Sequence, residues 1–109
     1  MTRPVRPGDV GAPAIVAGVD VDRVAAAVLA CPLVADLVTG EHGATETYLP
    51  GRRVPGIRVH DDGPGPARIA VSVSACYGAP MRRLVEQVRS AVAVRAPGHP
   101  VDVVVADVG

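Results

Sequence analysis

Hydrophobic and polar positions alternate most regularly between Ala67 and Cys76. One face of this stretch carries Ile69, Val71, Val73 and Ala75, and the other carries Arg68, Ala70, Ser72, Ser74 and Cys76. A period of two with β-branched residues on one side is typical of a half-buried strand. We therefore predict a strand here whose apolar face needs a cover.

The cover is supplied by the next segment, which changes to helical spacing. The apolar stripe of this segment consists of Met81, Leu84, Val85, Val88 and Val92. Pro80 suits the start of a helix, and Pro97-Gly98 ends the pattern after Ala96. A final run, Val101–Val108, is too apolar for a freely exposed edge strand, and the helix before it is long enough for a right-handed βαβ crossover. We expect this run to pair in parallel with the first strand.

A second helix is predicted near the start of the chain. Asp20 or Asp22 caps it, its apolar stripe runs from Val21 to Leu29, and Pro32 ends it. Before it, residues 14–19 fit either a short strand or an earlier turn of the same helix. Residues 1–13 contain three Pro and two Gly and are expected to be a flexible lead-in, which leaves 14–109 as a single α/β domain.

The middle of the chain predicts short strands separated by turns. Residues 33–39 and 44–49 are expected to be strands, and residues 50–56, which read Pro-Gly-Arg-Arg-Val-Pro-Gly, a stiffened loop. Residues 56–62 should pair with 67–76 as an antiparallel hairpin. The predicted class is α+β, a small single-layer sheet of mixed strands with two helices packed on one face, in the order α-β-β-β-β-α-β.

Composition narrows the possible functions. Eleven basic residues, all Arg, balance eleven acidic ones, and a net charge of zero argues against a general nucleic-acid surface. No apolar run approaches the roughly 20 residues of a membrane span, and no convincing signal peptide precedes the domain. Cys31 and Cys76 stand alone in apolar surroundings, so no disulfide framework is predicted and a reducing compartment is expected.

No residue constellation predicts a reaction, a cofactor or a metal site. His60, Asp61 and Asp62 are adjacent, so on a strand they point to opposite faces and cannot converge on one ion. The serines lack a nucleophile elbow, and no glycine-rich phosphate loop is present. We therefore expect a protein that is not an enzyme.

Two features are candidate partner-binding sites. Arg52 and Arg53, held between two Pro/Gly pairs, either present two guanidinium groups to an acidic or phosphate-bearing partner or pair internally with Glu46 or Asp62. Arg58 and His60 are expected beside Ala70, Ser72 and Ser74 on the outer face of the sheet, which is either a docking surface or a plain solvated face.

The stretch Tyr48–Val59, which reads YLPGRRVPGIRV, resembles the alkaline-shock, Gls-like envelope stress response family in its actinobacterial form. The helix ending at Pro32, the Tyr77–Pro80 turn, the helix around Glu86 and the closing valine-rich strand agree in order. The resemblance implies a cytoplasmic, non-catalytic protein at the inner face of the membrane. It implies binding to a membrane-anchored partner and association with itself or with sister copies.

Three functional hypotheses follow. The first is an envelope stress scaffold that binds its partner through Arg52, Arg53, Arg58, His60, Ser72 and Ser74. The second is a small RNA-binding module, against which the zero net charge and the lack of Phe and Trp argue. The third is a ligand-binding protein or enzyme whose site forms only in an oligomer.

Overall fold

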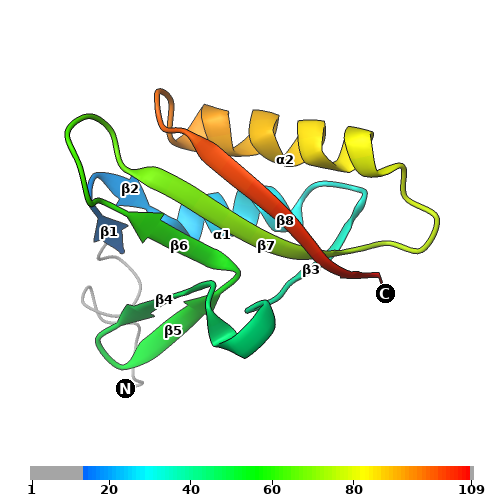
Figure 1. Cartoon of the computed structure of the whole chain (residues 1–109), viewed down its shortest axis with the longest axis horizontal. Coiled ribbons are helices and arrows are strands. Elements are labelled where there is room, and N and C mark those ends of the chain that lie inside the picture. The colour runs from blue at the N-terminus through cyan, green and yellow to red at the C-terminus, as the bar shows by residue number, and fades with distance from the viewer. Residues whose placement is uncertain (1–13, 109) are drawn as a thin grey trace, which may run out of the picture.

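A computed structural model describes residues 14–108 and shows a compact α+β fold (Figure 1). The expected lead-in at 1–13 lies outside the described residues. The elements, in chain order, are β1 (Ile15–Val16), β2 (Val19–Asp20), α1 (Val21–Leu29), β3 (Val34–Leu37), η2 (Glu41–Gly43), β4 (Glu46–Leu49), β5 (Arg52–Pro55), β6 (Ile57–His60), β7 (Arg68–Ala75), α2 (Met81–Arg95) and β8 (Val101–Val108).

Strand β7 is the centre of the main sheet. On one side it pairs in parallel with β8, and on the other it pairs antiparallel with β6 along its first half and β3 along its second. The strand paired with this side of β7 changes from β6 to β3 at Ser72. The Ser72 N–H donates to Gly56 O at 2.8 Å, and its carbonyl accepts from Val38 N at 3.0 Å. The predicted β6–β7 hairpin and the parallel β7–β8 pair are confirmed.

Both helices pack against the apolar face of β7, as the sequence predicts. Ile69, Val71, Val73 and Ala75 are fully buried there. The helices bury three residues each at helical spacing, namely Val21, Val24 and Val28 from α1 and Leu84, Val88 and Val92 from α2. Of the other expected stripe residues, Leu29 and Met81 are exposed, and each is a terminal residue of its helix. The Asp20 side chain caps α1 by accepting from Arg23 N at 3.1 Å.

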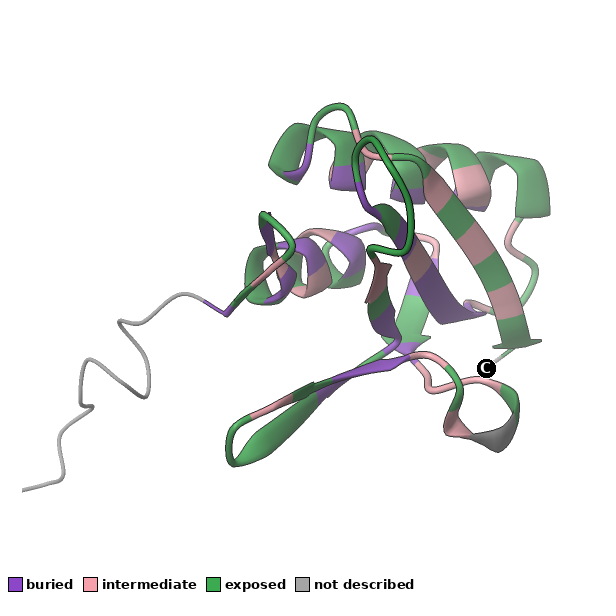
Figure 2. Cartoon of the chain, turned by 60° about the vertical axis from the view of Figure 1, so that its left-hand side comes forward, coloured by how far each residue is buried: buried purple, intermediate pink, exposed green. Residues whose placement is uncertain are grey.

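The two small hairpins have different outcomes: the strand alternative is confirmed for residues 14–19, whereas a strand replaces part of the loop expected at 50–56. Residues 14–19 do not extend the helix; β1 and β2 pair through a turn at Ala17 and Gly18, which both have positive φ, as such two-residue turns require. The expected loop at 50–56 is wrong, because Arg52–Pro55 forms β5 and pairs with β4. Figure 2 shows this β4–β5 hairpin standing away from the main sheet.

The sheet face opposite the helices is only partly exposed, which corrects another expectation. Ser72 and Ser74 are 1% and 8% exposed, and the segment joining β3 to β4 lies against Ser72 through Val38 and Gly40. The Ser72 hydroxyl lies about 3.4 Å from where a Cβ on Gly40 would sit, and it has no hydrogen-bond partner among the described residues. The expected outer face is therefore open around Arg58 and Ala70 but closed at Ser72 and Ser74.

Candidate functional site

The β4–β5 hairpin contains both arginines of the predicted site and sets their directions. Tyr48 pairs with Arg53 and Leu49 pairs with Arg52 across the two strands. Side chains of directly opposed residues share a face, and neighbours along a strand alternate. One face therefore carries Tyr48 and Arg53, and the other carries Leu49 and Arg52. The two guanidinium groups point in opposite directions and do not act as a pair.

Arg52 fastens the hairpin to helix α1. Its Nη1 and Nη2 donate to the two carboxylate oxygens of Asp22 at 3.0 and 2.7 Å, a bidentate geometry. This hydrogen bonding lowers the pKa of Asp22 below its ordinary value and raises the pKa of Arg52. The alternative of internal pairing is therefore correct for Arg52, with Asp22 as a partner that the sequence did not indicate. Arg52 holds the hairpin in place.

Arg53 and Tyr48 surround a buried carboxylate on the opposite face. Glu46 is 7% exposed, accepts a hydrogen bond from the Tyr48 hydroxyl at 3.0 Å and lies 3.8 Å from Arg53 Nη1. The Glu46 side chain is thus satisfied mainly by Tyr48, while the Arg53 side chain keeps 65% of its surface exposed. The internal Glu46 partner predicted for an arginine is confirmed for Arg53, at a long distance that leaves the guanidinium open to a further carboxylate.

An open groove runs beside this face of the hairpin. It has a volume of about 620 Å³ and is lined by Thr39, Gly43, Glu46, Arg53 and Pro55. We call the surface made of this groove together with Tyr48 the hairpin face. Its floor is polar, and Tyr48 at its edge is 66% exposed.

Tyr48 is the residue that sequence reasoning missed. Its ring is an exposed aromatic group beside an exposed guanidinium, and tyrosine and arginine are both enriched among the residues that dominate binding energy at interfaces. The signal was present in the alternation of Glu46 and Tyr48. It could be used only if residues 52–55 had been recognised as the opposing strand.

The remaining predicted site residues do not join the hairpin face. Arg58, on β6, lies opposite Ala70 of β7, as predicted. Its Nη1 donates to Ala44 O at 3.5 Å. His60 lies opposite Arg68 at the far end of β6. Ser72 and Ser74 are buried in the sheet, so they cannot contact a partner in this conformation.

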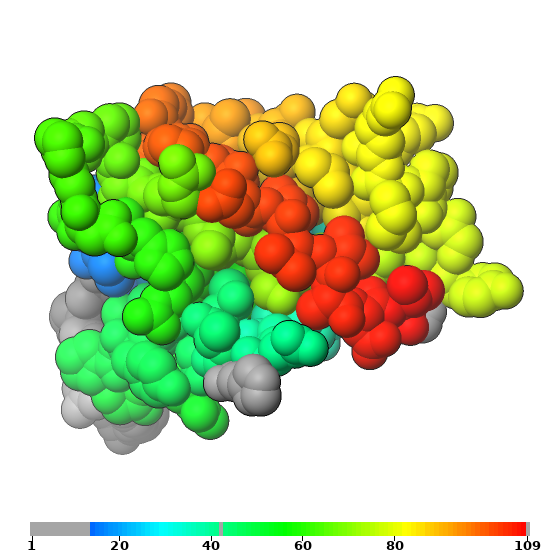
Figure 3. Space-filling view, viewed as in Figure 1, coloured from blue at the N-terminus to red at the C-terminus, as the bar shows by residue number. Residues whose placement is uncertain are grey.

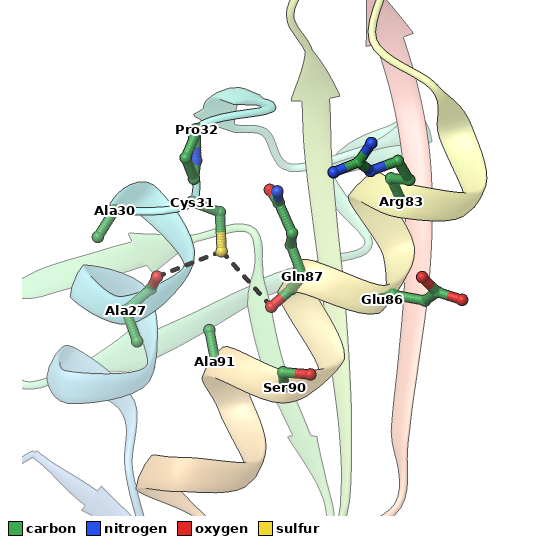
Figure 4. Close-up of a pocket in the computed structure, with 9 residues that line it drawn as sticks. All are labelled: Ala27, Ala30, Cys31, Pro32, Arg83, Glu86, Gln87, Ser90 and Ala91. Atoms are coloured by element: carbon green, nitrogen blue, oxygen red, sulfur yellow. Dashed lines mark hydrogen bonds between the residues drawn. The ribbon is translucent and has the colours of Figure 1, made fainter.

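A second groove lies between the two helices (Figure 4). It has a volume of about 570 Å³ and is lined by Ala27, Ala30, Cys31, Pro32, Arg83, Glu86, Gln87, Ser90 and Ala91. Its small side chains form an apolar floor below a charged rim. The Cys31 thiol lies 3.6 Å from the carbonyl oxygens of Ala27 and Gln87, and burial raises its pKa. A thiol held in its protonated form is a poor nucleophile at neutral pH.

Three further findings bear on function. Among residues 14–108, no three His, Cys, Asp or Glu side chains gather where they could hold a metal ion. No helix in that range is long and apolar enough to cross a membrane. No protein-family model, curated protein or solved structure matches the chain.

Proposed function

We propose that this protein is a non-catalytic scaffold of the envelope stress response that binds a membrane-anchored partner, and sister copies, at the inner face of the cell membrane. One observation carries the proposal. The stretch that resembles the stress-response family is also the stretch that forms the projecting hairpin, and it exposes Tyr48 and Arg53 side by side. The residues behind the resemblance thus coincide with a surface suited to binding another protein.

The chemistry of the hairpin face favours an acidic segment of a partner. Arg53 offers a planar fork of donors that matches a carboxylate. Its contact with Glu46 is 3.8 Å long, so the guanidinium can also bind a carboxylate of a partner. The Tyr48 ring adds apolar area with little entropy to lose, because its hydroxyl is already held by Glu46. We therefore expect the bound segment to place a carboxylate beside an apolar side chain.

The rest of the molecule supports the hairpin as a rigid platform. Its other face is buried through Thr47 and Val54, and the Arg52–Asp22 pair fixes it to α1. A prearranged surface loses less conformational entropy on binding than a mobile loop does. Contact with the membrane is then indirect, through the anchored partner.

Affinity capture from alkaline-stressed cells tests this proposal. The full chain with a tag serves as bait, compared with Tyr48→Ala, Arg53→Glu and the control Arg89→Glu, which reverses an exposed arginine on α2. Bound proteins are identified by mass spectrometry. We expect a membrane-anchored protein with a cytoplasmic acidic segment, retained by Arg89→Glu and reduced about tenfold or more by either hairpin variant, as loss of a central interface residue predicts. Equal capture by Arg53→Glu and Arg89→Glu would refute the role of the hairpin face.

A further inference from the structure

Strand β8 forms an edge of the main sheet with nothing paired to its outer side among residues 14–108. It is eight residues long, carries five valines, and contains no proline, lysine or arginine. Proline and positively charged side chains are among the features that protect a strand edge from pairing with another chain; of the other such features, β8 has two aspartates and a bulge after Val105. Figure 3 shows β8, in orange and red, as a diagonal band across the face of the molecule in that view. The valine-rich sequence of β8 predicts a strand that is not freely exposed at an edge, whereas the structure places it at the edge of the sheet. A partner strand beside β8 would account for this difference.

The register of the β7–β8 pair determines which backbone groups of β8 remain unpaired. Ile69 N–H donates to Pro100 O at 2.8 Å, and Ile69 lies opposite Val101. In a parallel pair this pattern directs the N–H and C=O of Asp102 and Val104 toward β7. The N–H and C=O groups of Val101, Val103 and Val105 therefore point outward along the free edge.

We propose that this edge pairs with the β8 edge of a second copy, antiparallel and with the two-fold axis at Val104. In that register Val103 of each copy faces Val105 of the other, and each such pair exchanges two backbone hydrogen bonds. The two Val104 residues, 54% exposed in the single chain, meet as a pair without hydrogen bonds, in which side chains approach most closely. Two four-stranded sheets then join into one continuous sheet.

The charges of β8 are compatible with this symmetric pairing. Its only charged side chains are Asp102 and Asp107. Only registers that place outward-pointing residues opposite one another can form the hydrogen bonds, and in the proposed register Asp102 faces Ala106. A register with Asp102 opposite Asp107 would place the outward-pointing residues of one copy opposite residues of the other that point to β7, so its backbone hydrogen bonds could not form. Asp102 is moreover paired with Arg68 at 3.2 Å in its own chain, which reduces the acidic charge near the edge.

A second copy also suits the limited length of the edge. A bulge between Val105 and Asp107 interrupts the register, so with the two-fold axis at Val104 the regular pairing is confined to residues 103–105 of each copy. A contact of this size falls below a standard protein interface, and we expect a weak dimer that forms at high local concentration. The inference depends on the edge alone and stands whether or not the hairpin face binds a membrane partner.

Amide exchange followed by NMR at low and high protein concentration tests this pairing on the intact chain. We expect the amides of Val103 and Val105 to become protected as concentration rises. The Val104 amide, which points to β7, should be protected throughout and serves as the internal reference. Concentration-independent protection of Val103 would mean that the chain covers its own edge, and no protection at any concentration would mean a free edge. Either result overturns the proposal.

Matched variants measured by sedimentation provide the second test. Val104→Asp places two carboxylates together at the two-fold axis, whereas Val94→Asp adds the same charge to a valine on α2 that is 74% exposed. Val103→Pro removes an outward N–H without breaking a bond to β7. We expect the dimer dissociation constant to rise about tenfold or more for Val104→Asp and Val103→Pro and to stay unchanged for Val94→Asp. Equal dissociation constants for the two aspartate variants would contradict the pairing.

Discussion

Replacing Gly56 by alanine should destabilise the protein at the point where β6 and β3 share one edge of β7. Gly56 has a φ of +81°, and a Cβ there would lie 2.7 Å from Leu37 Cβ and 2.8 Å from Ser72 O. One of these neighbours is a backbone atom of the central strand, so it cannot move aside without disturbing the sheet. Gly51, in the turn of the β4–β5 hairpin, has nearly the same φ of +79° but no heavy atom within 4 Å of such a Cβ.

The two glycines allow the cost of the close contact to be separated from the cost of the backbone angle. The left-handed conformation costs an alanine roughly 1–2 kcal/mol, part of which the stiffer unfolded chain offsets. Overpacking a buried site adds about 1–3 kcal/mol. We therefore expect a loss of about 1 kcal/mol for Gly51→Ala and, with the overpacking added, about 2–4 kcal/mol for Gly56→Ala. A domain of this size has a total stability of about 5–15 kcal/mol, so the first loss is severe.

Urea denaturation of both variants, followed by circular dichroism, measures the difference. Equal slopes of the unfolding free energy against urea would show that both variants unfold from the same compact state. The expected result is a lower midpoint for Gly56→Ala than for Gly51→Ala. If the two midpoints coincide, the close approach of Gly56 to β7 does not constrain the fold, and the junction at Ser72 must be arranged differently.

Three further predictions concern the helices and the thiols. Asp22→Asn should destabilise the protein at neutral pH. Because folding lowers the pKa of Asp22, the contribution of its carboxylate to stability is present above the unfolded pKa of about 3.9 and is lost as pH falls through the folded pKa. The urea denaturation midpoints of variant and wild type should therefore converge in acid. Leu84→Ala should cost about 2–5 kcal/mol in urea denaturation, against almost nothing for the exposed Val94→Ala. Iodoacetamide should modify Cys76 before Cys31, which mass spectrometry can locate; the reverse order would contradict the burial of Cys31.

The sequence predicted the elements whose periodicity is set by local burial. The alternation from Ile69 to Ala75 and the helical spacing of Leu84, Val88 and Val92 each arise because one face of an element meets the core. For the same reason α1, the β6–β7 hairpin and the parallel β8 follow from short stretches of sequence. These elements make up the main sheet and the helices that cover it.

The sequence failed where distant segments decide the environment. Ser72 and Ser74 are small and polar, as on a solvated face, yet both are buried, and Val38 and Gly40 of the segment between β3 and β4 lie against Ser72. Arg52–Pro55 is flanked by Pro and Gly, which favour a loop, yet pairing with β4 makes it a strand. The partner of Arg52 is 30 residues away on α1, and no local pattern indicates it. The sequence therefore indicated the segment that contains the two arginines, but not the opposite directions in which they point.

The role of the hairpin face is tested most directly by where the protein lies in stressed cells. Fluorescence microscopy of the full chain fused to a fluorescent protein would compare the wild type with Arg53→Glu and Arg89→Glu at equal expression. If the hairpin face binds a membrane-anchored partner, the wild type and Arg89→Glu will outline the cell membrane and Arg53→Glu will spread through the cytoplasm. A wild type that is itself diffuse under stress, or an Arg53→Glu variant that outlines the membrane equally well, would contradict that role.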